Sequence, residues 1–448
     1  MKLLKLFLLV GVLLSFAVQG AETPRLKLAV TSDIHSRWVH LEKVYAFLAA
    51  KNPDAVLFCG DLALAVADVP SYKTYMQIYN KHFSKCKVPP VHMVIPGNHD
   101  FWAPKGQKRL PAKDSLKRFF GTMGMTPEWL RHKVVKGYSI IAVSATDEKG
   151  ENRHTPGEIK QISDLIGKAE KAAPGKPVFV MTHCPPAFTM SSTAWKQKPE
   201  NTKSWYWRYD LVRKMFEGHP QAVSLSGHTH LALQDERAIW QGDFTAVSVG
   251  VLPRVTPKMP GDKVGSFRPV IAAQGRNFTY IEVFDKYMLV YRYDANTLKE
   301  INPDKRWRIE LPYDSAKAVY TAKRAEKTTA PEFAPGAKAE IVRDRKFYYV
   351  RLDRAKHPDM VHSYKVKLKF DDKKVKPLEF YVASDFFVPK PGRRAMLQFP
   401  NNVTVVPGAA GTMEISPVET FGKEGKALVT KFVIPRSAAA KKTVKQKK

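Results

Sequence analysis

Five short apolar runs of this chain each end in polar side chains that can bind a metal ion, and this repetition constrains the fold more than any other feature. The runs are rich in β-branched or other apolar residues and are bounded by Gly, Pro, Asn or Asp, which predicts buried strands. The predicted strands are Leu26–Thr31, Ala55–Cys59, Val91–Ile95, Val178–Thr182 and Val223–Ser226. The polar pieces that follow them are Asp33-Ile34-His35, Gly60-Asp61, Gly97-Asn98-His99-Asp100, His183 and Gly227-His228-Thr229-His230.

Helical patterns separate the predicted strands. They cover Val39–Ala50, Ser71–Phe83, Asp114–Phe120 and Glu158–Ala172. Strands that alternate with helices predict a layered α/β domain. In such domains the loops at the carboxyl ends of the strands gather at one edge of the sheet, where ligands bind. We therefore expect the five polar pieces to meet in space.

The side chains in these pieces suit transition metals. Asp33 and His35 are two residues apart, so on an extended chain they point the same way. The carboxylate of Asp61 has two oxygens and can bridge two cations, and Asn98 offers a neutral oxygen. Imidazole nitrogens come from His183, His228 and His230. Mixed oxygen and nitrogen ligands without thiolate favour Mn, Fe, Zn or Ni. Two metal ions about 3.5–4 Å apart can bind the attacking and the leaving oxygen of an in-line displacement at phosphorus.

In order and spacing, the polar pieces resemble the pattern of the calcineurin-like metallophosphoesterase family, which is D-x-H, G-D, G-N-H-D/E, H and G-H-x-H. The resemblance covers the chain from about Leu26 to Pro312 and implies a layered α/β/β/α sandwich. It implies two divalent or trivalent metal ions, whose identities the sequence leaves open. The ligands of the first ion would be Asp33, His35, Asp61 and His230, and those of the second Asp61, Asn98, His183 and His228. Asp61 would bridge both ions, with a water or hydroxide as nucleophile.

The same resemblance gives His99 the role of the family histidine that contacts the phosphate and protonates the leaving group. After Asp61 the chain reads Leu62-Ala63-Leu64. It therefore lacks the Tyr of purple acid phosphatases and the Asp and Arg-Gly of Ser/Thr protein phosphatases. The missing Asp is the usual partner of the catalytic histidine, and Asp100 and Asp68 are both open as substitutes. With these two subfamilies excluded, the motif pattern resembles the branch of the family that contains cyclic-nucleotide phosphodiesterases and phosphoesterases of broad specificity.

Three further residues are candidates for substrate contacts. Arg37 closely follows the first pair of ligands, and Trp205 and Trp207 lie between His183 and the last polar piece. Loops between ligand-bearing strands often carry specificity, and aromatic rings there can stack on a base or sugar. The competing interpretations are a solvated arginine and loop aromatics that pack on their own domain. His154, in a loop before a helix, is interpreted as a surface residue.

The first residues have the pattern of a secretory signal. Lys2 and Lys5 precede the apolar run Leu6–Val18, and small residues allow cleavage after Gly20. We therefore expect residues 1–20 to be a signal peptide and the protein to be exported to the periplasm, the cell surface or the medium. A retained anchor is the alternative. The cysteines, Cys59, Cys86 and Cys184, are too few for a disulfide framework and are expected to be free thiols.

Beyond the metallophosphoesterase domain, predicted for residues 21–313, the composition changes. Residues 314–336 are rich in Ala, Lys, Thr and Pro and are predicted to be a linker. In residues 337–437, strand-like runs alternate with turns, which predicts an all-β sandwich. This region resembles a fibronectin type III domain at Tyr364-Lys365-Val366 and at Val418-Glu419-Thr420-Phe421-Gly422. Residues 438–448 form a basic tail.

The formal net charge is +31. A charge of this size predicts weak attraction to polyanions such as acidic cell-envelope polymers, and no nucleic-acid fold motif is present. The predicted function is metal-dependent hydrolysis of a small phosphate ester, with a phosphodiester expected and a phosphomonoester as the alternative. A third hypothesis is that the protein binds polyanions of the cell envelope and that its metal site is structural. The complete ligand set, together with His99, argues against this hypothesis.

Overall fold

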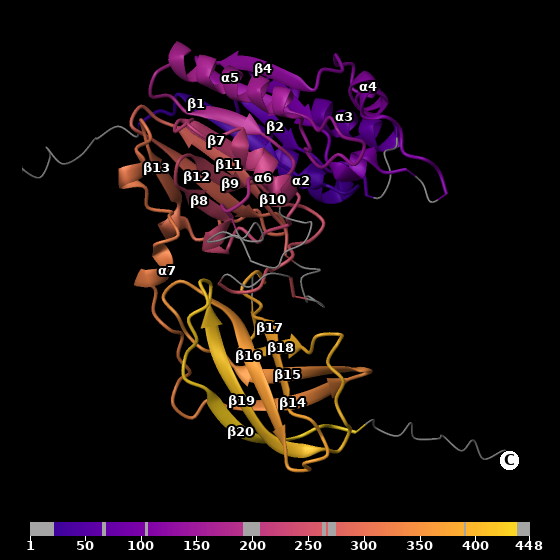
Figure 1. Ribbon diagram of the computed structural model, residues 1–448, viewed down its shortest axis with the longest axis vertical. Helices are drawn as coiled ribbons and strands as arrows, with labels where there is room; N and C mark the ends of the chain where they lie inside the picture. Colours follow the sequence, from indigo (N-terminus) through magenta and orange to yellow (C-terminus); the bar gives the residue numbers. More distant parts are fainter. Residues whose placement is uncertain are drawn as a thin grey trace, which may run out of the picture.

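The computed structural model describes residues 22–64, 69–103, 106–190, 207–261, 266–267, 275–388 and 391–436. Two mixed β-sheets form the larger part of the fold, and a region made only of β-strands follows it (Figure 1). This arrangement confirms the predicted fold class. Within the described ranges, no helix combines the length and the apolar character that a membrane crossing requires.

The first sheet has the strand order β13-β12-β11-β1-β2-β3, with β10 paired to β11. Its strands are β1 (Leu26–Thr31), β2 (Ala55–Cys59), β3 (Val91–Ile95), β10 (Gly250–Val251), β11 (Asn277–Val283), β12 (Tyr287–Asp294) and β13 (Trp307–Glu310). The neighbours β1, β2 and β3 are parallel, whereas β11 runs antiparallel to β1. The carboxyl ends of β1, β2 and β3 therefore share one edge.

The second sheet has the strand order β4-β5-β6-β7-β9-β8. Its strands are β4 (Leu130–Val135), β5 (Tyr138–Val143), β6 (Val178–Met181), β7 (Ala222–Ser226), β8 (Ile239–Gln241) and β9 (Thr245–Ser248). The neighbours β5, β6, β7 and β9 are parallel. The loops after β6 and β7 consequently leave the second sheet from one edge as well.

Helices cover the outer faces of the two sheets. They are α2 (Trp38–Ala49), α3 (Val69–Phe83), α4 (Ala112–Thr122), α5 (Pro156–Ala172) and α6 (Trp207–Lys214). Side chains of β1 alternate between two apolar clusters, as a strand buried on both faces requires. Leu28 and Val30 belong to a cluster with residues from both sheets, whereas Ala29 belongs to the cluster of α2, α3 and α4.

The helix that precedes β6 shows why the predicted helices start late. Four predicted helices are present, but each begins one or two residues before its apolar pattern does. In α5 the first turn is polar and is stabilised by a capping box, in which Thr155 accepts from the backbone N–H of Glu158 and Glu158 accepts from that of Thr155. A pattern of apolar residues cannot reveal a first turn that is polar, so the predicted start of the helix is too late.

The interpretation of His154 as a surface residue is wrong. Its side chain is buried, with Nδ1 3.2 Å from the hydroxyl of Thr146 and the ring packed near Trp129. Burial lowers the pKa of His154 to about 4, so the ring is neutral at physiological pH. Its place before the capping box of α5 pins this loop against the domain.

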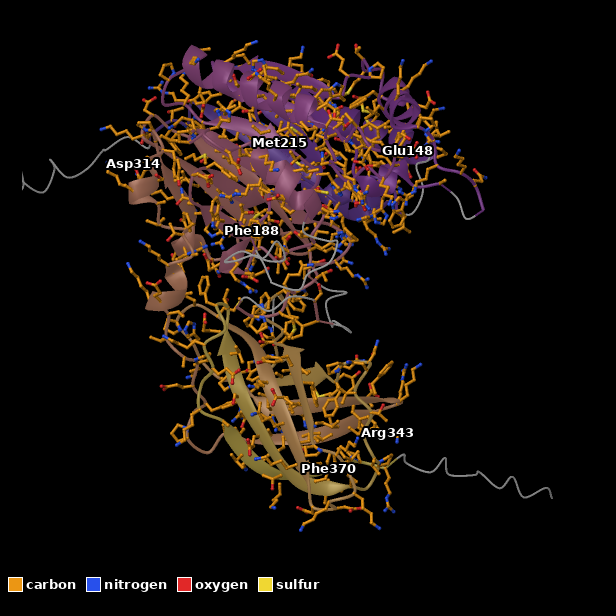
Figure 2. All side chains as sticks on the ribbon, viewed as in Figure 1. Glu148, Phe188, Met215, Asp314, Arg343 and Phe370 are labelled. Atoms are coloured by element: carbon orange, nitrogen blue, oxygen red, sulfur yellow. The ribbon has the colours of Figure 1, made fainter. Side chains whose placement is uncertain are left out.

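The C-terminal region consists of two antiparallel sheets with the orders β14-β15-β18 and β17-β16-β19-β20. The strands are β14 (Ala339–Asp344), β15 (Phe347–Asp353), β16 (Val361–Phe370), β17 (Leu378–Ala383), β18 (Arg394–Gln398), β19 (Ala410–Glu419) and β20 (Leu428–Val433). Apolar side chains from both sheets form one core. Phe370 lies in the part of this region remote from the larger domain (Figure 2). The all-β character is as predicted, and the resemblance to fibronectin type III stays a prediction.

The stretch predicted as a linker lies against the α/β domain. It contains α7 (Arg324–Lys327). Arg324 donates from Nη1 to the carbonyl of Glu236 and from Nη2 to that of Ile239. The exact domain boundaries stay predictions. All three cysteines are free, as expected, and Cys59 and Cys184 are buried.

Candidate metal centre

The loops after β1, β2 and β3 of the first sheet meet the loops after β6 and β7 of the second. The structure brings together the seven side chains that the sequence assigned to two metal ions. Three sets of ligand atoms, each within 4.8 Å of one another, could hold an ion; they are Asp33, His35 and His230; His35, Asp61 and His99; and Asp61, His183 and His228. Each side chain's role as a ligand stays a prediction, but its position is the one that this role needs.

Asp61 lies between the two groups. One of its oxygens, Oδ2, is 3.5 Å from His35 Nε2 and 3.3 Å from His183 Nε2. Its other oxygen, Oδ1, accepts a hydrogen bond of 2.8 Å from the backbone N–H of His99. No other acidic residue in the described part of the site belongs to sets on both sides. This is the position that a bridging carboxylate would occupy.

The outer members of each group are also in contact. On one side, Nε2 of His230 lies 3.1 Å from Asp33 Oδ1 and 3.2 Å from His35 Nε2. On the other side, Oδ1 of Asn98 lies 3.0 Å from His183 Nε2 and 2.9 Å from His228 Nδ1. Asn98 thus completes the second group with a neutral oxygen.

Backbone carbonyls orient the imidazole rings. Nδ1 of His183 donates to the carbonyl of Cys59 over 2.9 Å, and Nδ1 of His35 donates to that of Ala63 over 3.2 Å. A carbonyl can only accept, so these contacts place a proton on Nδ1 and leave Nε2 as the ring nitrogen that faces Asp61. Such outer contacts fix the tautomer of metal-binding histidines.

The backbone of these loops is strained. Positive φ angles of 45° to 64° occur at Asp33, His35, Asp61, His228 and His230. For residues with a Cβ this conformation costs free energy, and it persists where the surrounding structure enforces it, typically at functional sites. The extended-chain geometry expected for Asp33 and His35 is therefore wrong. A tight turn, in place of a strand, brings the two side chains together.

Glycine is required directly before three of the ligand residues. A Cβ at Gly97 would overlap the carboxylate of Asp61, and one at Gly227 would overlap that of Asp33. At Gly60 it would press on the ring of His183. The glycines of the sequence motifs thus leave room for side chains that converge from neighbouring loops of both sheets.

Charge in the centre is balanced between carboxylates and imidazoles. Burial by itself would raise the pKa of Asp33 and of Asp61, but the neighbouring histidines outweigh it and hold both below their usual range. Burial would likewise lower the pKa of His183, yet Asp61 raises it to about 9. Burial and the neighbouring His183 lower the pKa of His228 to about 3. Two buried, ionised carboxylates thus draw positive charge into the site.

The donor set fits metal ions. Oδ1 of Asp33 is buried and has no hydrogen-bond partner within the described residues, although Nε2 of His230 and Nε2 of His35 lie 3.1 Å and 3.7 Å from it. Buried polar atoms are normally satisfied, so this oxygen is free to ligate a cation. Oxygen and imidazole ligands without thiolate suit Mn, Fe, Zn or Ni.

His99 stands at the edge of the centre. Its Nδ1 donates to the carbonyl of Leu64 over 2.7 Å, and its Nε2 lies 3.9 Å from Asp61 Oδ2. The indole of Trp102 stacks on the ring, with 3.8 Å between centroids. Burial lowers the pKa of His99, and His35 adds to this effect against the opposing charge of Asp61.

Asp100 does not partner His99. Its carboxylate accepts from the backbone N–H groups of Gly97, Leu62 and Ala63, and so ties the loop after β3 to the loop after β2. The other open candidate, Asp68, lies outside the described residues. The partner found for the histidine is the Leu64 carbonyl, which the sequence could not reveal because any residue supplies one.

The candidate substrate contacts are only partly placed. Arg37 is exposed at the start of α2. Trp205 and the side chain of Trp207 lie outside what the structure describes. A residue that the sequence did not single out, Arg276, lies close enough to Arg37 that burial and this neighbouring charge lower its pKa. Two guanidinium groups thus stand near each other beside the loop that carries His35.

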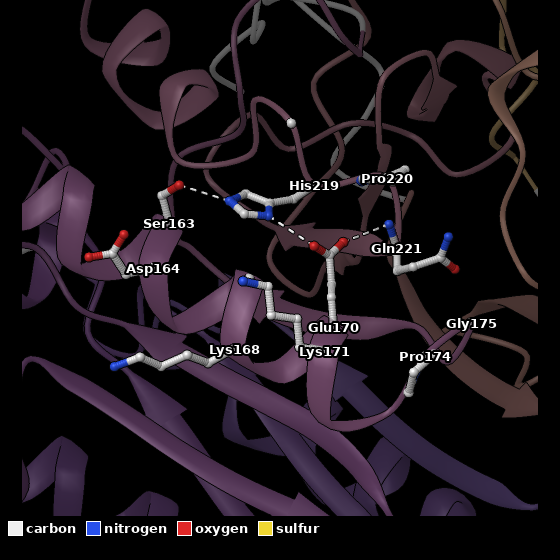
Figure 3. A pocket seen from close by; sticks show the side chains of 12 residues that line it. Ser163, Asp164, Lys168, Glu170, Lys171, Pro174, Gly175, His219, Pro220 and Gln221 are labelled. Atoms are coloured by element: carbon white, nitrogen blue, oxygen red, sulfur yellow. Dashed lines mark hydrogen bonds and ion pairs between the residues drawn. The ribbon is translucent and has the colours of Figure 1, made fainter.

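A second constellation is reminiscent of a hydrolase triad but lacks its essential part. Ser163 Oγ lies 2.8 Å from His219 Nε2, and His219 Nδ1 lies 3.0 Å from Glu170 Oε2 (Figure 3). Ser163 lies inside α5, where backbone N–H groups are used by the helix and offer no oxyanion hole. The other oxygen of Glu170 accepts from the backbone of Gln221. This chain of hydrogen bonds fastens the loop before β7 to α5.

Comparison with known proteins agrees with the geometry. Residues 26–232 match the model of the calcineurin-like phosphoesterase family. This part of the chain is therefore a calcineurin-like metallophosphoesterase domain, the catalytic domain of a metal-dependent phosphoric ester hydrolase, and its substrate is a phosphate ester. A search of curated proteins gave no match.

Several solved structures are similar to part of this chain. A purple acid phosphatase from yellow lupin seeds has 12% identity over 64% of this chain and 55% of its own, with a TM-score of 0.41. A phosphoesterase from E. coli has 13% identity over 63% and 98%, with a TM-score of 0.28. An archaeal phosphodiesterase has 11% identity over 64% and 100%, with a TM-score of 0.24. These values are too low to say anything about the substrate of this chain.

Replacing Asp61 tests the bridging position. We expect Asp61→Asn to lose bound metal and nearly all phosphate-ester hydrolysis, because one carboxylate faces both ligand groups. Metal content is measured by elemental mass spectrometry on the purified protein. Asp164→Asn, which removes an exposed carboxylate on α5, is the control and should change neither quantity. A variant Asp61→Asn with two ions and full rate would rule out bridging.

Replacing His99 separates proton transfer from metal binding. We expect His99→Ala to keep its metal and to lose activity by on the order of 10²–10⁴-fold, the usual range for general acid–base help. The loss should shrink for substrates with better leaving groups. The exposed His132 on β4 serves as control through His132→Ala. Since His99 also lies within ligand distance of His35 and Asp61, loss of metal in His99→Ala would instead make it a ligand.

Proposed function

Because residues 26–232 form a calcineurin-like phosphoesterase domain, we propose that this chain is an exported two-metal phosphodiesterase. The observation that carries the two-metal proposal is the place of Asp61 between two groups of ligand atoms. A single-ion site would need only one of these groups. The proposal assigns Asp33, His35, Asp61 and His230 to one ion, and Asp61, Asn98, His183 and His228 to the other.

Two ions held by these residues would neutralise charge on a phosphoryl group and would lower the pKa of water at the site. The chain itself supplies the rigid frame. Loops from two sheets fix the ligands, and the hydrogen bonds of Asp100 to the loops after β2 and β3 keep Asp61 and Asn98 in register. Preorganised groups of this kind do not have to be rearranged as charge develops during reaction.

His99 is the residue proposed to exchange a proton with the leaving group. Its Nδ1 is committed to the Leu64 carbonyl. Nε2 is therefore the ring nitrogen left for a substrate oxygen, and it lies on the side of Asp61. Trp102, stacked on the ring, prevents the imidazole from turning away. To act as a general acid, Nε2 must itself carry a proton, and the charge of the nearby Asp61 favours that protonated form against the effect of burial.

The preference for diesters rests on the surroundings of His99 and on charge. The half-buried indole of Trp102 borders the proposed leaving-group side, and Trp205 and Trp207 are proposed as a further aromatic wall. A diester offers such walls an organic group on each side of phosphorus, whereas a monoester offers only one. The net charge of +31 attracts anionic esters and supports weak binding to anionic envelope polymers, which should weaken as salt is raised.

A substrate panel tests this preference. We expect kcat/KM to be higher for bis-p-nitrophenyl phosphate than for p-nitrophenyl phosphate, with the protein reconstituted with Mn²⁺. Trp205→Ala and Trp207→Ala should lower kcat/KM for the diester more than for the monoester. A clear preference for the monoester, with kcat/KM unchanged in both variants, would refute the diesterase proposal without affecting the proposed metal centre.

Export is tested at the N-terminus. The basic start and the apolar run Leu6–Val18 support cleavage after Gly20. Mass spectrometry of protein recovered from outside the cytoplasm should therefore find an N-terminus at Ala21. An intact Met1 on membrane-bound material would replace the signal peptide with an anchor.

A further inference from the structure

The segment that carries the last two predicted metal ligands continues directly into the contact with the β-sandwich. Two residues after His230, Ala232 joins Val251, Val255 and Phe387 in one buried apolar cluster. Phe387 belongs to the loop between β17 and β18 of the sandwich. The sandwich thus contacts the chain only two residues after His230, one of the predicted metal ligands.

A buried ionic cluster follows on the same segment. Arg237 pairs with Asp235 through two hydrogen bonds, Nε to Oδ1 at 3.0 Å and Nη2 to Oδ2 at 2.7 Å. Its Nη1 donates to the carbonyls of Met259 and Gly261. Arg237 is 1% exposed and Asp235 is 2% exposed. Removing either partner of such a pair leaves a buried charge uncompensated.

The sandwich completes this cluster. Nη2 of Arg237 also donates to Nε2 of His362, on β16, over 3.1 Å. Burial, with the charge of Arg237, lowers the pKa of His362, so the ring is neutral and can accept this bond. The ring of His362 stacks on Phe386, the neighbour of Phe387. One face of the sandwich therefore supplies both a polar and an apolar contact to residues 232–237.

Backbone atoms of the two domains are also in contact. The N–H of Gly261 donates to the carbonyl of Thr420 over 3.0 Å. A Cβ at Gly422 would lie 3.2 Å from Cα of Gly261, and both glycines have positive φ. The stretch Val418-Glu419-Thr420-Phe421-Gly422, which spans the end of β19 and the turn after it, is thus part of the domain contact. In the sequence it is distinguished only by its resemblance to fibronectin type III.

We infer that the β-sandwich is a positioning element for the metal centre, which holds the loop of His228 and His230 through the Arg237–Asp235–His362 cluster and through Phe387. The inference rests on the proposed function only in requiring that these histidines bind metal. The backbone at both is strained, with φ of 64° and 54°. A strained loop needs support from its surroundings, and the sandwich contacts residues 232–237 at Ala232 through Phe387 and at Arg237 through His362.

The test measures Mn²⁺ binding to the full chain, after chelation and reconstitution with Mn²⁺ alone. His362→Phe keeps a ring of similar size but removes the acceptor for Arg237, and Phe387→Ala removes the apolar contact. Each should raise the dissociation constant for Mn²⁺ about tenfold, the lower end of losses seen for groups behind metal ligands. His362→Gln, which offers an acceptor oxygen, should restore affinity to near that of the native chain.

A matched control separates positioning from general destabilisation. Val350→Ala removes buried volume from the core of the sandwich, and should lower thermal stability without changing Mn²⁺ affinity. Hydrogen exchange should show faster exchange of amides in residues 228–238 for His362→Phe and Phe387→Ala, but not for Val350→Ala. If His362→Phe does not fold, Phe387→Ala and its exchange pattern decide the question by themselves.

The inference is overturned if the folded interface variants bind Mn²⁺ as tightly as the native chain, or if Val350→Ala weakens binding equally. Failure of the proposed function looks different. A native chain that binds Mn²⁺ but hydrolyses no phosphate ester would refute the function and leave the positioning role intact. A native chain that binds no Mn²⁺ would overturn both.

Discussion

Two ionised carboxylates buried at the junction of two sheets, Asp33 and Asp61, govern the structure around them. Burying an isolated ionised carboxylate costs several kcal/mol, so the chain must surround each with compensating groups. Histidines from both sheets, His35 on one side and His183 and His230 on the other, do this, and they hold both pKa values low despite complete burial. The strained turns and the glycines without room for a Cβ are the means by which the two sheets reach this contact.

The need to compensate the buried carboxylates also distinguishes residues that are placed to bind an ion from residues that position the loops. Groups that face Asp61 directly are placed to bind an ion, whereas Asp100 faces backbone N–H groups and only holds loops together. His99 is held by a carbonyl and an indole at the margin, where a substrate can reach it. Buried polar residues near the centre thus divide according to what each one faces, even where they are neighbours in the sequence.

Sequence patterns predicted the parts of the structure that depend on local chemistry. Apolar runs located β1, β2, β3, β6 and β7, and the polar residues after them coincide with the centre. Strands β4, β5, β8, β9, β10 and β14 were not anticipated, and neither was the burial of His154. In β4, in β14 and around His154 the polar residues are indistinguishable from surface residues without their tertiary partners. The contact of Arg237 with His362 joins residues 125 positions apart, and neither residue has a local pattern that marks it. The positive φ angles at the ligands were also missed, since non-glycine residues adopt them only under tertiary constraint.

The order of the ligands along the chain affects when metal selectivity can arise. During synthesis, the proposed ligands Asp33, His35, Asp61 and Asn98 emerge first, and three of these four offer oxygen atoms. The proposed imidazole ligands His183, His228 and His230 emerge only with β6 and β7. Oxygen ligands suit hard ions such as Mg²⁺ and Ca²⁺, whereas imidazoles shift preference toward transition metals. A nascent or partly folded chain would thus discriminate poorly among cations, and the choice of metal is deferred until the two sheets have packed together.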